Sequence, residues 1–146
     1  MTGLEMLRAI ASGEQAGAPI ADLMGFQAVE AEEGRVLFAS VPGPQHYNPI
    51  GSVHGGLAAT LLDSAMGCAV HSTLPDGSGY TTLELKVNFT RPITVDTGRI
   101  LCEGTVVHRG GRVATAEGRV WAERSGKLLA HGTTTCLIFS TGGQPG

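Results

Sequence analysis

The spacing of hydrophobic residues changes several times along the chain, and each change predicts a different element. Apolar residues among the first dozen positions fall on one helical face, and Pro19 favours a second short helical turn. We therefore expect residues 1–24 to form a helical segment packed on the rest of the domain. Two short strands are predicted next, over residues 26–31 and 35–41.

The middle of the chain carries a loop and then one long apolar segment. Proline and glycine are frequent over residues 42–53, which predicts a loop. Residues 54–74 lack proline and are rich in alanine and leucine, which predicts a helix that Pro75 and the following glycines end. Four strands are predicted in the rest of the chain, over residues 82–89, 99–108, 112–123 and 128–139. Apolar and polar residues alternate in the first of them, and turn-forming residues mark the ends of the others.

The connections between these elements decide the fold class. Short turns between the last three strands force antiparallel pairing, and a single helix cannot supply the crossovers of a parallel sheet. The sequence therefore predicts an α+β fold, with an antiparallel sheet and one dominant helix packed on its face. We expect the domain proper to span residues 25–139, followed by a flexible tail over 140–146.

Composition narrows the class of protein. The chain has 146 residues, the size of one domain, and a net charge of −3 without a basic cluster, which argues against nucleic acid or membrane partners. Cys68, Cys102 and Cys136 are widely spaced and form no CxxC pair, so we expect neither disulfides nor a metal. The first residues do not resemble a signal peptide, and we predict a cytoplasmic location.

The long helix carries one acidic residue in an apolar setting. Asp63 is the only acidic residue between Glu33 and Asp76, and the helix has no lysine or arginine to pair with it. Its neighbours one turn away are mostly small, which lets a ligand or a second backbone come close. An unpaired, partly buried carboxylate often serves chemistry. The structural alternative is a carboxylate at an exposed helix edge, or one hydrogen-bonded to the hydroxyl of Ser64 or Thr60.

Two glycines, Gly55 and Gly56, open the same helix. Backbone N–H groups at a helix start have no partner within the helix and lie at the positive end of its dipole, so they can hold a phosphate or an oxyanion. The alternative is that the glycines only permit a tight turn.

The spacing of Gly55 and Asp63 adds a geometric constraint. Eight residues of helix separate them by about 12 Å, and an aspartate cannot bridge that distance to one reacting carbonyl. Two antiparallel copies of the helix, related by a twofold axis, can place one donor beside the other chain's carboxylate. The sequence therefore predicts a homodimer with two equivalent sites.

The pattern of these residues resembles the hotdog-fold thioesterases of the phenylacetate-degradation (PaaI-like) family, from about Gly25 to Phe139. The residues that carry the resemblance are Asn48, Gly51, His54-Gly55-Gly56, Asp63, Asn88-Phe89-Thr90-Arg91-Pro92, the glycine and arginine hairpin that includes Arg112, and Gly126-Lys127-Leu128. The resemblance implies a curved antiparallel sheet wrapped around one long helix, usually in a dimer of dimers. It also implies hydrolysis of an acyl-coenzyme A thioester.

The resemblance further implies roles for individual residues. The Gly55 N–H would hold the thioester oxygen, and Asp63 of the other subunit would be the nucleophile or the general base. Asn48 would position the lytic water or the thioester. Thr82 would orient that water or the carboxylate, with Thr81 as the alternative.

Coenzyme A would be the leaving group, and no separate cofactor is expected. Its phosphates need cations or bare amides. We expect the substrate to be bound by Val53, Gly56, Thr81, Arg91, Pro92, Arg109, Gly110, Gly111 and Arg112. His54 is expected to hydrogen-bond the loop and lock the helix start, with proton transfer as the alternative.

Several functional questions stay open from the residues. The acyl group is either aryl or medium-chain, and Met24, Phe26, Leu62 and Met66 are candidates for its pocket. Two other functions compete with hydrolysis. One is a hotdog enoyl-CoA hydratase or dehydratase, which would pair a catalytic histidine with a carboxylate. The other is a non-catalytic acyl-CoA sensor.

Overall fold

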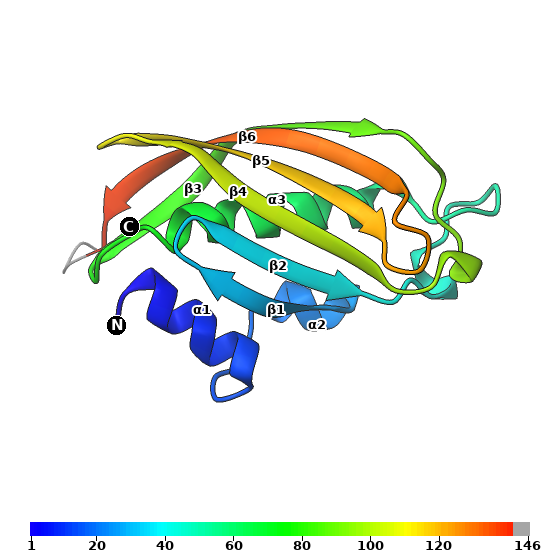
Figure 1. Cartoon of the computed structure of the whole chain (residues 1–146), viewed down its shortest axis with the longest axis horizontal. Coiled ribbons are helices and arrows are strands. Elements are labelled where there is room, and N and C mark those ends of the chain that lie inside the picture. The colour runs from blue at the N-terminus through cyan, green and yellow to red at the C-terminus, as the bar shows by residue number, and fades with distance from the viewer. Residues whose placement is uncertain (142–146) are drawn as a thin grey trace.

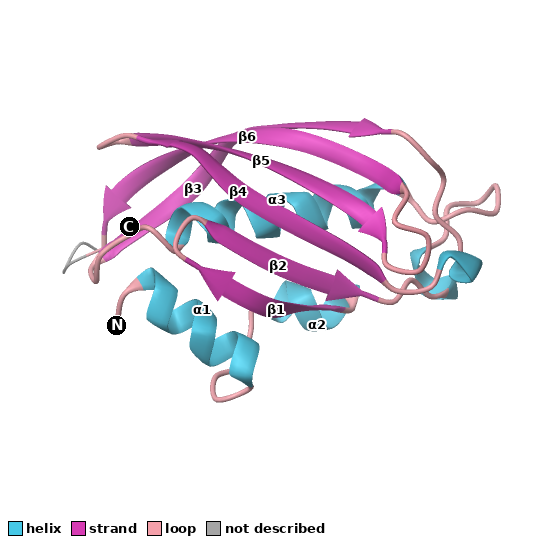
Figure 2. Ribbon diagram, viewed as in Figure 1, coloured by secondary structure: helices cyan, strands magenta, loops and turns pink. Residues whose placement is uncertain are grey.

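A computed structural model describes residues 1–141, which form three α-helices, two short 3₁₀ helices and six strands (Figures 1 and 2). The α-helices are α1 (Gly3–Ser12), α2 (Pro19–Met24) and α3 (Gly55–His71), and the 3₁₀ helices are η1 (Pro44–His46) and η2 (Val95–Thr97). The strands are β1 (Phe26–Glu32), β2 (Arg35–Ser40), β3 (Ser78–Phe89), β4 (Ile100–Arg109), β5 (Val113–Ala122) and β6 (Leu128–Ser140).

All six strands form one antiparallel sheet in the order β1-β2-β4-β5-β6-β3. The sheet curves around α3, as Figure 1 shows, while α1 and α2 lie beside β1 at one side of the molecule. The short connections do pair β4, β5 and β6 antiparallel, as predicted. The α+β hotdog architecture expected from the sequence is confirmed.

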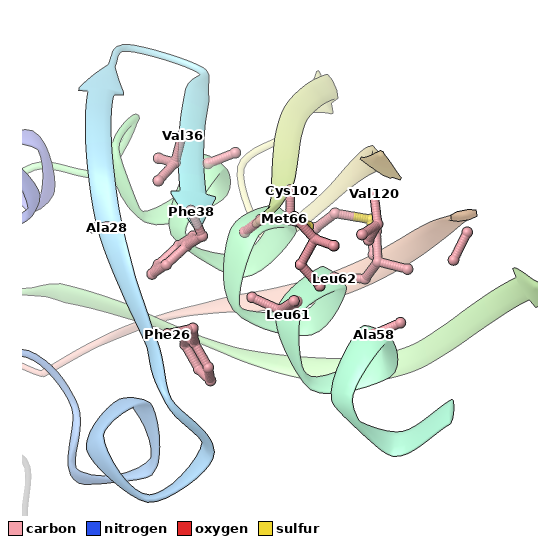
Figure 3. Close-up of a cluster of buried hydrophobic side chains, with 14 of the residues drawn as sticks. Phe26, Ala28, Val36, Phe38, Ala58, Leu61, Leu62, Met66, Cys102 and Val120 are labelled. Atoms are coloured by element: carbon pink, nitrogen blue, oxygen red, sulfur yellow. The ribbon is translucent and has the colours of Figure 1, made fainter. Parts of the chain in front are cut away.

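Helix α3 lies so close to the sheet that one strand residue must be glycine. A Cβ placed on Gly104 of β4 would collide with the carbonyl group of Ala65. Leu62 and Met66 are fully buried, and Figure 3 shows Met66 beside Cys102 and Val120. These two residues therefore belong to the core that α3 forms with the sheet.

The predicted helix is three residues too long at its C-terminal end. Helix α3 ends at His71, and Ser72 and Thr73 follow it. The Ser72 hydroxyl donates to the Ala69 carbonyl at 2.6 Å, and the Thr73 hydroxyl donates to the Val70 carbonyl at 2.6 Å. These side-chain hydrogen bonds compete with the helical pattern. Within residues 1–141, no helix is both long and apolar enough to cross a membrane.

Strand β3 departs from the prediction in two ways. It begins at Ser78, four residues before the expected start, and it contains a β-bulge. Thr82 pairs with Cys136 and Glu84 with Thr135, so Leu83 is an extra residue on β3. A bulge interrupts the alternation of side chains between the two faces of a strand.

Both ends of the chain are held against the domain, and only the C-terminal end departs from the prediction. At the N-terminal end, Leu7 of α1 is buried, and the Gly3 N–H donates to the Leu74 carbonyl at 3.2 Å. At the other end, Ser140 still belongs to β6, and the Thr141 N–H donates to the Gly77 carbonyl at 2.7 Å. The predicted tail therefore does not begin at 140. Its last residues, 142–146, lie outside the described residues.

Candidate active site

Among residues 1–141, the carboxylate of Asp63 has one hydroxyl partner, and it comes from another element. The Thr82 hydroxyl of β3 donates to Asp63 Oδ1 at 2.8 Å. Both residues are half-buried. The predicted structural partner Thr60 instead donates its hydroxyl to the Gly56 carbonyl at 2.8 Å. Asp63 is thus fixed in the middle of α3 by the edge strand, with its second oxygen left for other contacts.

The bulge at Leu83 makes this hydrogen bond possible. Phe89 also faces α3, because a Cβ on Gly55 would come within 3.0 Å of its ring. Thr82 and Phe89 are seven residues apart, so an unbroken strand would turn them to opposite faces. The extra residue brings both to the helix side. Thr81, the predicted alternative to Thr82, is exposed and neighbours it on the strand, so it is not part of this pair.

The start of α3 uses one of its two glycine amides internally. His54 is the N-cap residue, and its Nδ1 accepts a hydrogen bond of 2.8 Å from the Gly56 N–H. The predicted lock of the helix start is therefore present. The same bond corrects the expectation that both amides are bare, because the Gly56 N–H is occupied. Among the described residues, the Gly55 N–H has no acceptor.

Asn48 organises the loop before the helix. Its Oδ1 accepts from the backbone N–H groups of Ile50 at 3.0 Å and Ser52 at 3.2 Å. Its Nδ2 donates to the Ser52 hydroxyl at 3.1 Å. These bonds turn the side chain back on its own loop. The loop is tied onward by the Val53 N–H, which donates to the Ile93 carbonyl at 2.8 Å.

A cavity of about 320 Å³ lies at the start of α3 and gathers several predicted residues. It is lined by Val53, His54, Gly55, Ala58, Phe89, Thr90, Arg91, Pro92 and Ile93. A second hollow shares Arg91 and Pro92 and adds Arg124 and Lys127 from the β5–β6 turn. No local pattern in the sequence relates Arg124 or Lys127 to Arg91. Gly126-Lys127 formed part of the resemblance, but only the fold shows that it lies beside Arg91.

The other predicted cations lie far from this cavity in the same chain. Arg109, Gly110, Gly111 and Arg112 form the β4–β5 hairpin, at the opposite end of the sheet from the start of α3 (Figure 1). The Arg112 carbonyl accepts from the Ile138 N–H at 2.7 Å, level with the first half of β3. One chain therefore does not bring this hairpin together with Gly55. Helix α3 is also unbroken from 55 to 71, so Gly55 and Asp63 stay about 12 Å apart.

The histidines other than His54 do not form a metal site. His46 is buried and receives the Gly43 N–H on Nδ1 at 3.0 Å, while its Nε2 lies 2.6 Å from the Met24 carbonyl oxygen. Burial lowers the pKa of His71, whose Nδ1 has no partner in the part of the chain that the structure describes. Within residues 1–141, no three histidine, cysteine or acidic residues are placed to hold a metal ion.

Comparison with known proteins identifies the family. The family model described as "Thioesterase superfamily" matches residues 50–129, more than half of the chain and all of α3. The chain belongs to the thioesterase superfamily. This assignment confirms the resemblance to hotdog-fold thioesterases and places the chain in a family of thioester hydrolases.

Relatives of this thioesterase-superfamily chain cover different parts of it. A Halobacterium salinarum protein provisionally named an esterase is 42% identical over 69 residues, which are 46% of this chain and 44% of that protein. Mouse acyl-coenzyme A thioesterase 13 is 30% identical over 62% of this chain and 64% of its own length. The matches thus span less than two thirds of either relative.

A solved structure of a related protein shares the fold over most of the chain. It is a mutant of the phenylacetic acid degradation protein PaaI from Thermus thermophilus. That structure superposes with a TM-score of 0.74 and 26% identity, covering 82% of this chain and 98% of that one.

Proposed function

We propose that this chain hydrolyses acyl-coenzyme A thioesters to a free acid and coenzyme A, in a site shared by two copies of the chain. The observation that carries the proposal is the Gly55 N–H, which has no acceptor in the described chain and lines a cavity at the positive end of α3. A donor in that position stabilises the negative charge that develops on a thioester oxygen during attack. The match to an acyl-coenzyme A thioesterase supports coenzyme A as the leaving group.

Asp63 supplies the other half of the chemistry. As a general base, it takes a proton from water while the water oxygen bonds to the carbonyl carbon. The tetrahedral intermediate then collapses, the C–S bond breaks, and the coenzyme A thiolate takes up a proton. As a nucleophile, the carboxylate itself displaces the thiolate, and water hydrolyses the resulting anhydride. A single turnover in ¹⁸O-labelled water separates these routes, because only the anhydride route can leave label in Asp63.

Two copies of the chain are needed for one site. The Gly55 N–H and the Asp63 carboxylate cannot reach one carbonyl from the same helix, because more than two helical turns separate them. Strand β3 is an edge of the sheet and exposes Leu83, Leu85 and Phe89. Natural sheets rarely leave an apolar edge strand uncovered. We therefore assign this edge to a second copy of β3, related by a twofold axis, and expect a dimer or a dimer of dimers.

The phosphates of coenzyme A require cations near the start of α3. Arg91, Arg124 and Lys127 line the hollow next to the Gly55 cavity. Arginine and lysine bind phosphate oxygens through charge-assisted hydrogen bonds. The hairpin from Arg109 to Arg112 can contribute only from the partner subunit, because it lies at the far end of its own sheet.

The structure disfavours the hydratase alternative. A catalytic histidine must be free to take a proton, whereas His54 Nδ1 already accepts from the Gly56 N–H. No described histidine other than His54 lines the Gly55 cavity. The sensor alternative predicts binding of acyl-coenzyme A without turnover, so the same experiment decides it.

The test is release of free thiol from a panel of aryl- and fatty acyl-coenzyme A substrates. The wild-type chain is compared with Asp63→Asn and with Asp76→Asn, a matched change at an exposed acid outside the site. The proposal predicts turnover that falls at least roughly 10²-fold in Asp63→Asn alone. Binding of coenzyme A without thiol release would instead support a sensor. Loss or gain of the enoyl double bond, followed by ultraviolet absorbance, would support a hydratase.

A further inference from the structure

A different cavity, of about 330 Å³, lies between the N-terminal helices and α3. Leu7 and Ile10 of α1 and Ala21 of α2 form one wall, and Phe26 at the start of β1 continues it. Ser64 and Cys68 of α3, with Tyr80 of β3, form the opposite wall. Figure 3 shows Phe26 and Phe38 on β1 and β2, away from the group of Met66, Cys102 and Val120. The cavity therefore borders the part of the core that α1, α2, β1 and β2 contribute.

The α3 wall of this cavity begins directly beside the candidate catalytic carboxylate. Ser64 follows Asp63 on α3, and Tyr80 precedes Thr82 by two residues on β3. Tyr80 and Thr82 both contact α3, so they face the same side of β3. A Cβ placed on Gly67 of α3 would meet the Tyr80 ring. The Thr82 hydroxyl donates to Asp63. Two lining residues of the cavity, Ser64 and Tyr80, are thus close neighbours in the chain of the hydrogen-bonded pair Asp63 and Thr82.

The walls carry no group that would neutralise an anion. Among the described lining residues, none is lysine, arginine or histidine, and Asp22 is the only carboxylate. Burial raises the pKa of the Cys68 thiol to about 12, and burial also raises the pKa of the Tyr80 hydroxyl above its usual value. Both groups are therefore uncharged near neutral pH. The remaining lining is mostly apolar side chains from α1, α2, β1 and β2.

We infer that this cavity is the acyl chamber, that it takes an uncharged apolar acyl group, and that α1 and α2 set its length limit. The inference rests on the proposed thioester hydrolysis. An engineered cavity of roughly 150 Å³ holds one benzene ring, and a water-sized group such as a methylene occupies roughly 30 Å³. A cavity of about 330 Å³ therefore holds a chain of roughly ten carbons, and a single ring leaves it half filled.

The first test is the dependence of kcat/KM on acyl length, measured from butanoyl- to hexadecanoyl-coenzyme A. Wild type should be most active near eight to ten carbons. Ala21→Phe fills the chamber, so kcat/KM for decanoyl-coenzyme A should fall at least tenfold while that for butanoyl-coenzyme A changes less than threefold. Ala11→Phe adds the same volume to α1 outside the chamber and should leave the profile unchanged.

A second variant guards against a folding defect in the first. Ile10→Ala enlarges the chamber at a partly buried position and should shift the optimum by about two carbons toward longer chains. Glutaryl-coenzyme A, compared with pentanoyl-coenzyme A of equal length, should react at least 100-fold more slowly because Asp22 and Asp63 repel its carboxylate. An unshifted length profile in both variants, or equal use of glutaryl and pentanoyl substrates, would overturn the inference.

Failure of the chamber and failure of the proposed function give different results. If wild type hydrolyses thioesters but neither variant changes the length profile, the function stands and the chamber assignment is wrong. If wild type releases no thiol from any substrate, the proposed function is wrong. Calorimetric binding of a non-hydrolysable decyl-coenzyme A thioether then tests the chamber alone, and Ala21→Phe should weaken that binding at least tenfold. Equal binding to wild type and Ala21→Phe would overturn it.

Discussion

The hydroxyl of Thr82 lies 2.8 Å from Oδ1 of Asp63 and joins the edge strand β3 to the middle of α3. Only one of the two carboxylate oxygens accepts this bond, so Thr82 fixes the carboxylate without covering it. A carboxylate held in this way presents its other oxygen in a defined direction. This geometry suits either attack on a carbonyl or removal of a proton from water.

Replacement of Thr82 tests that positioning role. Thr82→Val keeps the size and the strand preference of the side chain but removes the donor, so kcat for thioester hydrolysis should fall about tenfold or more. Thr82→Ser restores a hydroxyl and should stay within about threefold of wild type. A valine variant as fast as wild type would show that the hydrogen bond does not position Asp63.

The identity of this partner could not be fixed from the sequence. The residue types indicated a hydroxyl near Asp63, and the resemblance gave Thr82 with Thr81 as the alternative. In an unbroken strand, the side chains of Thr82 and Phe89 would point to opposite faces of the sheet. Only the extra residue Leu83 brings both toward α3. A bulge depends on the register with β6, where the partners of Thr82 and Glu84 lie more than 50 residues later in the chain, and the local pattern does not contain it.

The role of the Gly55 amide is tested by deleting that one donor. Gly55 is the first residue of α3, a position where proline is well tolerated, and His54 has the extended conformation that favours a following proline (ψ 137). Gly55→Pro should lower kcat roughly 10²- to 10³-fold. Gly55→Ala keeps the N–H and adds a Cβ near the exposed Phe89 ring, so it controls for size. Equal loss in both variants would count against an oxyanion role.

His54 is predicted to act as a helix cap. His54→Ala removes the acceptor of the Gly56 N–H and should lower the free energy of unfolding by about 1 kcal/mol. His54→Asn offers a side-chain oxygen at the same position and should recover most of that stability and of kcat. Urea unfolding and steady-state kinetics of both variants make the comparison. An asparagine variant that is stable but as inactive as His54→Ala would point to proton transfer by the imidazole.

The helix start shows what the sequence predicts well and what it does not. The apolar run and the two glycines predicted where α3 begins to within one residue, because caps and breakers are local signals. Which glycine amide stays free depends on the rotamer of His54, which the pattern does not specify. Similarly, the sequence alone does not show that the sheet covers the side of α3 that carries Leu62 and Met66.

His71 should make stability depend on pH. Burial lowers its pKa below the usual 6.5, so below about pH 6.5 the unfolded chain binds a proton that the folded chain resists. Stability from this group is therefore present above that pH and is lost as the pH falls toward the lowered pKa. Urea unfolding should show that the free energy of unfolding falls from about pH 7.5 to about pH 5.5. In His71→Phe this fall should be smaller. His131→Gln, at an exposed position, should leave it unchanged, and an equal loss in all three proteins would contradict the assignment.

The shared site makes a quantitative prediction for mixed dimers. Gly55→Pro and Asp63→Asn are each expected to be nearly inactive alone, since each removes one half of both sites. In a heterodimer of the two variants, one site carries both defects and the other carries neither, provided that each site takes Gly55 from one chain and Asp63 from the other. Random pairing makes about half of the dimers heterodimers, and each has one intact site of two.

The most direct measurement is therefore the thioesterase activity of the two variants co-expressed with different affinity tags and purified together. The shared-site account predicts recovery to about a quarter of wild-type specific activity, and to about half when heterodimers are isolated through both tags. If Gly55 and Asp63 act within one chain, every site keeps one defect. Activity of isolated heterodimers no higher than that of the separate variants would contradict the account.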